Sequence, residues 1–147
     1  MNDCIFCKII DGTVPSWKVY EDESHLAFLD IRPLNKGHVQ VITKKHYDYV
    51  YDVPQFGSYC EVAKSVGLAQ KKVLGALHFS LLTFGSEVKH AHIWVVPRYE
   101  NDGHGGFFDM HNVKTIAPKE MELIAEQLRS FLSLDSQTLG LNDNQRA

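Results

Sequence analysis

The segment Val88-Lys89-His90-Ala91-His92-Ile93-Trp94-Val95-Val96-Pro97-Arg98 carries most of the information about the fold. Polar or aromatic side chains alternate in it with small apolar ones, and this pattern predicts a strand over 88–96. His90, His92 and Trp94 are expected to share one face of the strand, with about 6–7 Å between successive side chains. The other face is small and apolar, so it suits packing against a helix.

The rest of the chain surrounds this strand with both helices and strands. Apolar stripes at the helical period predict a short helix before Gly12, a long helix over 55–74 and a last helix that begins at Pro118. Short runs rich in β-branched and aromatic residues predict four more strands, at 17–20, 25–30, 38–43 and 77–84. Because hairpins join most of the strands, including one with a tight connection at 85–87, we predict an α+β domain with an antiparallel sheet.

Size and composition indicate one globular domain. The chain has 147 residues, of which 44% are hydrophobic and 22% charged, and its formal net charge is -3. Without a basic cluster, general affinity for a nucleic acid polymer is not expected. No apolar run approaches the ~20 residues that span a bilayer, and no secretion signal pattern is present, so we expect a cytoplasmic protein without membrane contact. We assign residues 1–135 to a single domain and 136–147 to a polar C-terminal tail.

The cysteines do not form the even-numbered framework of a small disulfide-rich protein. There are three, Cys4, Cys7 and Cys60. The closely spaced pair Cys4 and Cys7 can hold a metal, take part in redox chemistry or have no chemical role. Cys60 falls on the apolar stripe of the long helix, so we expect an inert core thiol.

His90 and His92 admit three interpretations when only the residues are considered. They can be ordinary polar side chains on a half-solvated sheet, or they can bind a metal together. Alternatively, one ring acts as a nucleophile while another group orients it.

Several short motifs, taken in order, resemble the histidine triad (HIT) family of nucleotide-binding hydrolases and transferases. The mark of that family is three histidines that alternate with apolar residues on a strand, often before Pro-Arg, and 88–98 is similar to it. Further similar segments lie at 4–10, 18–23, 26–31, 37–38 and 44–46. The resemblance spans about the first hundred residues. It implies a HIT-like fold with a five-stranded antiparallel sheet, a long central helix, a short N-terminal helix and a C-terminal helix.

The resemblance also implies a reaction. His92 would attack the α-phosphorus of a nucleoside phosphate, such as a phosphoramidate or a dinucleoside polyphosphate, to form a nucleotidyl-histidine that water resolves. His38 would lie on a neighbouring strand and help to orient the catalytic ring. A neutral imidazole suits this role, because one nitrogen can donate to a carbonyl while the other presents its lone pair. We therefore expect a nucleotide hydrolase or nucleotidyl transferase.

The implied nucleotide site takes a purine nucleotide between the N-terminal helix and the first hairpin. Asp30 is expected to accept hydrogen bonds from the ribose hydroxyls, and apolar side chains form a slot for the base. The other expected contacts are Phe6, Ile9, Phe28, Ile31, Ser86, Val88 and Trp94.

Three positions depart from the family pattern. Trp94 stands where the third histidine is expected, Ser86 replaces a glutamine that usually touches the phosphate, and Glu87 stands where serine is common. Tryptophan cannot carry a positive charge or transfer a proton, and a carboxylate repels a phosphate. Two alternatives to the hydrolase therefore stay open. One is a nucleotide-binding module with weak or no turnover, and the other is a metal-dependent hydrolase with His90 and His92 as ligands.

A structural zinc ion is a further implication of the resemblance. The matching ligands are Cys4, Cys7, His46 and His90. A set of two cysteines and two histidines with no open position would pin the first helix to the sheet.

The family resemblance also implies a homodimer built through the long helix and a sheet edge. Phe56, Tyr59 and Val66 are candidates for that face, and the alternative is that they belong to the core of the monomer.

Overall fold

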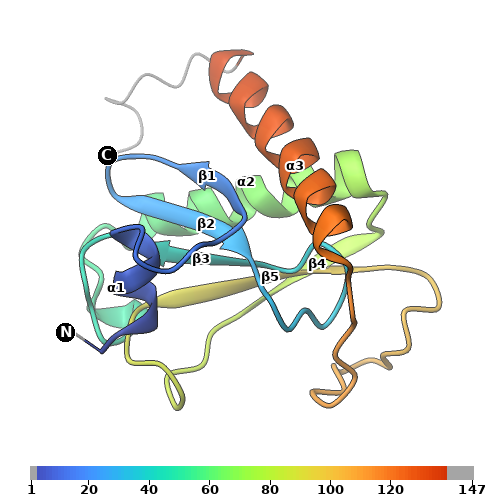
Figure 1. Cartoon of the computed structure of the whole chain (residues 1–147), viewed down its shortest axis with the longest axis horizontal. Helices are drawn as coiled ribbons and strands as arrows, with labels where there is room; N and C mark the ends of the chain where they lie inside the picture. The colour runs from blue at the N-terminus through green and yellow to red at the C-terminus, as the bar shows by residue number, and fades with distance from the viewer. Residues whose placement is uncertain (1–2, 139–147) are drawn as a thin grey trace.

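Five strands form one antiparallel sheet in the order β1-β2-β3-β5-β4 (Figure 1). The computed structural model describes residues 3–138. The strands are β1 (Lys18–Glu21), β2 (His25–Leu29), β3 (Val39–Thr43), β4 (His78–Leu82) and β5 (His92–Arg98). The helices are α1 (Ile5–Ile10), the 3-10 turn η1 (Val50–Asp52), α2 (Phe56–Leu74) and α3 (Pro118–Thr138). The predicted α+β class with a five-stranded antiparallel sheet is thus confirmed.

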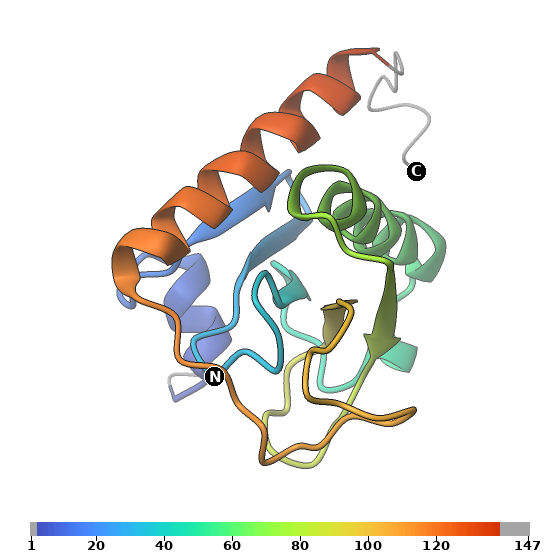
Figure 2. The ribbon, with the colours of Figure 1, turned by 90° about the vertical axis from the view of Figure 1, so that its right-hand side faces the viewer.

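The long helices α2 and α3 lie side by side over one face of the sheet, while α1 lies on the other (Figure 2). The main core fills the space between the sheet and the two long helices. β5 contributes Ile93 and Val95 to it, together with Ala91 just before the strand. The small apolar face expected from the alternation therefore packs against helices, because successive side chains of a strand point to opposite faces.

A second, smaller core lies under α1. Phe6 and Ile9 of α1 pack there with Phe28, and the ring centroids of Phe6 and Phe28 are 5.8 Å apart. The apolar side of this six-residue helix is buried by the sheet, which stabilises a helix too short to persist alone in water. This contact places the N-terminal cysteines beside the end of β3.

The prediction of a tight connection at 85–87 is wrong, and so is the prediction that the next strand starts at 88. β4 ends at Leu82 and β5 begins at His92, so a loop over 83–91 joins them. The backbone N–H of Ala91 donates to the carbonyl oxygen of Tyr47 at 2.7 Å instead of to a strand partner. Alternation before His92 therefore reflects the contacts of a loop and not a continued sheet.

The long helix α2 buries most of its inner face against the sheet. Tyr59 and Val66, two of the candidates for a dimer face, are fully buried in the main core. Phe56 is instead 48% exposed. Two of the three candidates for a dimer face, Tyr59 and Val66, therefore belong to the core of the monomer.

The last helix extends to Thr138, so the first residues of the expected tail at 136–147 are helical. The remainder of that tail lies outside the described residues. Within residues 3–138, no helix has the length and apolar character needed to cross a membrane.

Candidate catalytic and metal sites

Two cysteines and two histidines converge at the N-terminal end of α1. One ligand atom from each of Cys4, Cys7, His46 and His90 lies within 4.8 Å of all the others. The Sγ of Cys4 lies 3.4 Å from Nδ1 of His90, and the Sγ of Cys7 lies 3.3 Å from Nδ1 of His46. A tetrahedral zinc with bonds of about 2.0–2.3 Å has ligand atoms about 3.3–3.8 Å apart. The spacing therefore fits a metal ion of this kind.

The protons of both histidines are arranged as a metal site requires. Nε2 of His90 donates to the carbonyl oxygen of Thr43 at 2.7 Å, and Nε2 of His46 donates to the carboxylate of Asp48 at 3.2 Å. Each Nδ1 is thus left with a lone pair that faces the sulfur atoms. Such outer hydrogen bonds fix the tautomer and ring orientation of metal-binding histidines.

Burial acts on the ionisation of the same cluster. Burial lowers the pKa of His90, which keeps its ring neutral. Burial and the neighbouring Cys4 raise the pKa of the Cys7 thiol in the absence of a metal. A bound cation reverses this second effect, because it stabilises the thiolate.

The ring of His92 is held in one orientation by its own backbone neighbour. Its Nδ1 donates to the carbonyl oxygen of His90 at 2.6 Å, and the edge of Phe6 lies against it with ring centroids 5.4 Å apart. Because Nδ1 carries the proton, Nε2 has the lone pair. No described residue forms a hydrogen bond with that Nε2.

A pocket of about 180 Å³ lies in front of His92. The segments that line it are 48–51, 83–85 and 90–92. Phe84 on its rim contacts Trp94, with ring centroids 5.2 Å apart. His92 thus borders a cavity that a small part of a ligand can enter.

His38 lies just before β3 and contacts Trp94, with ring centroids 5.0 Å apart. Its Nδ1 accepts a hydrogen bond from the backbone N–H of Leu34 at 3.1 Å, so Nε2 carries the proton. Burial lowers the pKa of His38 to about 4, against the opposing effect of Asp30. In the described part of the chain, no hydrogen bond or ring contact joins His38 to His92.

Asp30 is buried and already hydrogen-bonded. One carboxylate oxygen accepts from the backbone N–H of Arg32 at 2.7 Å, and the other accepts from the side-chain amide of Gln40 at 2.8 Å. The second oxygen also lies 3.6 Å from Nε2 of His38. The carboxylate is thereby held in a fixed position beside the ring of His38.

The other residues expected to contact the nucleotide differ in exposure. Ile31 is 77% exposed, whereas Phe6, Ile9 and Phe28 are buried in the small core under α1. Val88 packs on the edge of that core. Ser86 is exposed on the 83–91 loop. These residues thus lie around the same face of the sheet as His92, at different depths.

Sequence reasoning missed a polar network that orders the glycine-rich loop after β5. The guanidinium of Arg98 donates to the carboxylate of Asp102 at 2.8 Å, and the side chain is only 13% exposed. Asn35 donates both to that carboxylate and to the carbonyl oxygen of Pro97, each at 2.8 Å. His104 donates through Nε2 to the carbonyl oxygen of Leu34 at 2.8 Å. In the sequence, the only indication of this network was the four-residue spacing between Arg98 and Asp102.

This network connects the loop to the turn that precedes His38. Leu34, whose carbonyl accepts from His104, is the same residue whose N–H fixes the tautomer of His38. The loop after β5 therefore helps to hold the turn beside Trp94.

The fold and the position of His92 at the start of β5 place this chain in the class of α+β domains that carry a strand-borne histidine beside a pocket. Comparison identifies the family within that class. The HIT domain family matches residues 11–101, and the chain belongs to it.

Several relatives have similar sequences. An uncharacterised HIT-like protein of Methanocaldococcus jannaschii is 45% identical over 107 residues, which cover 68% of this chain and 82% of that protein. An adenylylsulfatase of Arabidopsis thaliana is 38% identical over 108 residues, which cover 69% of this chain and 55% of that protein. The adenosine 5'-monophosphoramidase of Schizosaccharomyces pombe is 32% identical over 135 residues, with coverage of 85% and 94%.

Solved structures share the fold. A hypothetical histidine triad nucleotide-binding protein of Sulfolobus tokodaii matches with a TM-score of 0.80 and 28% identity, covering 94% of this chain and 97% of that one. A zinc-bound histidine triad family protein of Mycobacterium smegmatis matches with a TM-score of 0.73 and 31% identity, with coverage of 92% and 98%.

Proposed function

We propose that this chain is a nucleotide hydrolase or nucleotidyl transferase that acts at the α-phosphate of a nucleoside phosphate through His92. The supporting observation is the hydrogen bond from Nδ1 of His92 to the carbonyl oxygen of His90, which leaves the lone pair on Nε2 of a residue that lines a pocket. The named activities of the Arabidopsis and Schizosaccharomyces relatives, both on adenylyl compounds, favour a purine nucleotide as substrate.

In the proposed reaction, Nε2 of His92 forms a bond to the α-phosphorus while the bond from phosphorus to the leaving group breaks. Water then attacks the phosphorus and the bond to Nε2 breaks, which releases the nucleoside monophosphate and restores the ring. The hydrogen bond to His90 stabilises the positive charge on the ring as the first bond forms, because the carbonyl oxygen accepts the remaining N–H.

The nucleotide is proposed to lie across the face of the sheet beside α1. Asp30 receives the ribose hydroxyls, and Ile31 offers the most exposed apolar surface for the base. The remaining proposed contacts are Phe6, Ile9, Phe28, Ser86, Val88 and Trp94. His38 is proposed as a positioning residue that acts through the ring of Trp94.

A nucleotide-binding module with little turnover is the second candidate. We propose that Trp94 occupies the place of the third histidine of the family, where an indole can neither carry a charge nor transfer a proton. Its ring contacts His38 and Phe84, so the place is filled by aromatic surface.

A metal-dependent hydrolase with His90 and His92 as joint ligands has less support. In the residues that the structure describes, the group able to hold a metal includes His90 and excludes His92. We propose that Cys4, Cys7, His46 and His90 bind a structural zinc that pins α1 to the sheet.

We propose a homodimer as the assembly of this chain. The edge strand β4 and the outer side of α2 expose large apolar side chains, and burying them in an interface is favourable. These side chains are Phe56, Leu68 and Leu81, together with Leu77 just before β4.

Hydrolysis of adenosine 5'-phosphoramidate by the full chain tests the proposed function. Wild type is expected to release adenosine monophosphate and to show, after rapid acid-free quenching, a mass increase of one adenylyl group. The variant His92→Ala is expected to lose both signals, whereas His111→Ala, which removes an exposed loop histidine, keeps them. Equal rates for wild type and His92→Ala contradict the proposal. Calorimetric binding of adenosine monophosphate without product formation selects the second candidate.

A further inference from the structure

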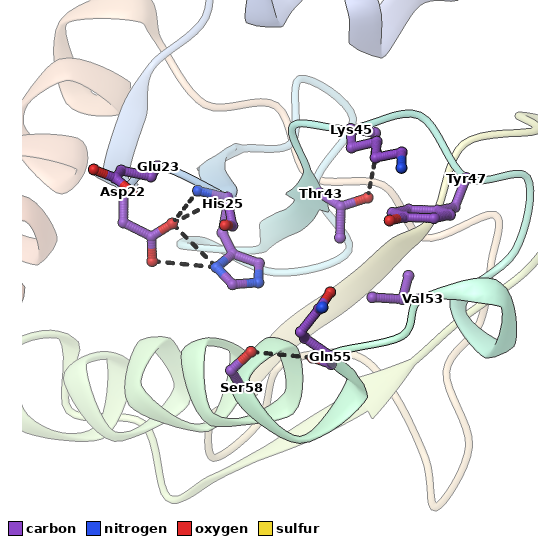
Figure 3. A pocket seen from close by; sticks show the side chains of 10 residues that line it. Asp22, Glu23, His25, Thr43, Lys45, Tyr47, Val53, Gln55 and Ser58 are labelled. Carbon is purple, nitrogen blue, oxygen red and sulfur yellow. Dashed lines mark hydrogen bonds and ion pairs between the residues drawn. The ribbon is translucent and has the colours of Figure 1, made fainter. Parts of the chain in front are cut away.

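A second and larger pocket, of about 430 Å³, lies between the turn that joins β1 to β2 and the first turn of α2 (Figure 3). It shares no lining residue with the pocket in front of His92. Its walls are formed by Asp22, Glu23, Ser24, His25, Thr43, Lys45, Tyr47, Val53, Gln55 and Ser58. Nothing in the proposed reaction uses this cavity.

His25 presents one ring nitrogen to this pocket. The residue is only 6% exposed, and its Nδ1 lies 3.1 and 3.2 Å from the two carboxylate oxygens of Asp22. Its ring is stacked on Tyr59, with centroids 5.7 Å apart and planes 7° apart. Nε2 forms no hydrogen bond with any described residue, and Figure 3 shows it pointing into the cavity. The imidazole is therefore a rigid, buried group with one unused nitrogen.

The kind of ligand that Nε2 can bind depends on which groups of the lining carry protons. A carboxylate only accepts, so Nδ1 of His25 carries the proton that it gives to Asp22, and in the neutral ring Nε2 has the lone pair. The hydroxyl of Thr43 donates to the carbonyl oxygen of Lys45 at 2.8 Å, and the hydroxyl of Ser58 donates to that of Gln55 at 3.1 Å. Both hydroxyl protons are thus used within the protein. Nε2 of the neutral ring and the two hydroxyl oxygens can therefore accept hydrogen bonds from a ligand.

The charged side chains around the pocket also bear on the kind of ligand that it can bind. Asp22 and Glu23 contribute two carboxylates, and Lys45 is the one cationic side chain in the lining. The Lys45 ammonium lies 5.3 Å from the ring centroid of Tyr47. Asp22 keeps its negative charge, because hydrogen bonds from Tyr20 and from the backbone N–H of Ser24 and His25 hold the carboxylate. Asp22, Glu23 and Lys45 together give the lining a formal charge of -1, which favours a cation.

We propose that this pocket binds a small organic cation with a primary ammonium group, which donates a hydrogen bond to Nε2 of His25. The hydroxyl oxygens of Thr43 and Ser58 are in the same lining and can accept the other ammonium protons. The ring of Tyr47 and the methyl groups of Val53 cover the aliphatic part of the ligand. The proposal is independent of the chemistry at His92.

Titration of the ¹⁵N-labelled full chain with propylammonium tests the proposal, with the Nε2 resonance of His25 as the readout. A saturable shift of that resonance is expected. His25→Asn is expected to weaken binding about tenfold or more, because a hydrogen bond to a charged partner is lost. Ser58→Ala, which removes one acceptor and leaves the buried ring in place, is expected to weaken it several-fold. His111→Asn is the matched control and keeps the affinity of wild type.

Three further probes distinguish the chemistry. Tetramethylammonium has the charge but no N–H donor, so it is expected to bind much more weakly than propylammonium. Propionate and inorganic phosphate, which are anions, are expected not to bind. A lack of saturable shift with propylammonium, equal binding of tetramethylammonium, or preferred binding of either anion overturns the proposal. If His25→Asn fails to give a folded amide spectrum, an unchanged affinity in Ser58→Ala overturns it instead.

Discussion

His90 connects the cluster of Cys4, Cys7 and His46 to His92. Its carbonyl oxygen accepts the hydrogen bond from Nδ1 of His92 at 2.6 Å, while its own Nδ1 lies 3.4 Å from the Sγ of Cys4. The residue that positions the ring of His92 is therefore also a member of the cluster at the end of α1. A shift of the His90 carbonyl would remove the hydrogen bond that keeps the proton on Nδ1 of His92.

Removal of one cysteine is expected to empty the metal site. We expect Cys7→Ala to reduce bound zinc from about one ion per chain to nearly none, because three remaining ligands bind zinc far more weakly. We also expect a fall in Tm of about 10 °C, since binding to the native state stabilises it. Metal analysis of protein purified without a chelator, together with a thermal scan, measures both effects.

Cys60→Ala is the control for that variant. Cys60 is half-buried on α2 and lies outside the cluster. The metal content of Cys60→Ala is therefore expected to equal that of wild type. Equal and low zinc in wild type and Cys7→Ala would show that the cluster is not a metal site.

Introduction of a histidine at position 94 is expected to raise turnover. Trp94→His places a protonatable group beside His38, and we expect a rate increase on adenosine 5'-phosphoramidate of about 10²-fold. Trp94→Phe keeps an uncharged ring, so no gain is expected from it. The comparison is made by steady-state kinetics of both variants. A rate in Trp94→His at or below that of Trp94→Phe argues against a proton-transfer role for this position.

Two glycines of α2 provide a packing test within one helix. A Cβ at Gly67 would lie 2.4 Å from the ring of Phe79 in β4, whereas a Cβ at Gly57 would meet nothing within 4 Å. We expect Gly67→Ala to lower the free energy of unfolding by about 1–3 kcal/mol through overpacking. Gly57→Ala is expected to be neutral or stabilising, by at most about 1 kcal/mol, because alanine favours helix. Urea denaturation of both variants gives the comparison, and equal free energies for the two would contradict the close contact with Phe79.

The contribution of Asp102 is expected to depend on pH. Hydrogen bonds from Arg98 hold the pKa of Asp102 well below its usual range, so its stabilising effect is complete above about pH 4 and is lost as the pH falls through the lower native value. Asp102→Asn is expected to cost about 3 kcal/mol near neutral pH, because it leaves the guanidinium without its charged partner. Denaturation of wild type and variant at neutral pH and at about pH 2 measures the gap between them. The gap should shrink in acid, and a constant gap contradicts this account.

Local sequence patterns were sufficient for most elements and for the two faces of β5. The long helix expected at 55–74 is observed at Phe56–Leu74, because its apolar stripe and its boundary at Pro54 are local properties. Sequence alternation overestimated β5 at its start, since a strand also needs a hydrogen-bonding neighbour. The N–H of Ala91 bonds to Tyr47, which is far away in the sequence.

The residue types and their order already pointed to the HIT family and to the cysteine and histidine set at the end of α1. Only the tertiary structure decided how the protons are distributed. It directs Nδ1 of His92 to the carbonyl of His90, buries His25 against Asp22 and Tyr59, and ties Arg98 to Asp102 and Asn35. A sequence pattern specifies which groups are available along the chain. Which nitrogen keeps a lone pair depends on partners that come together only when distant segments pack.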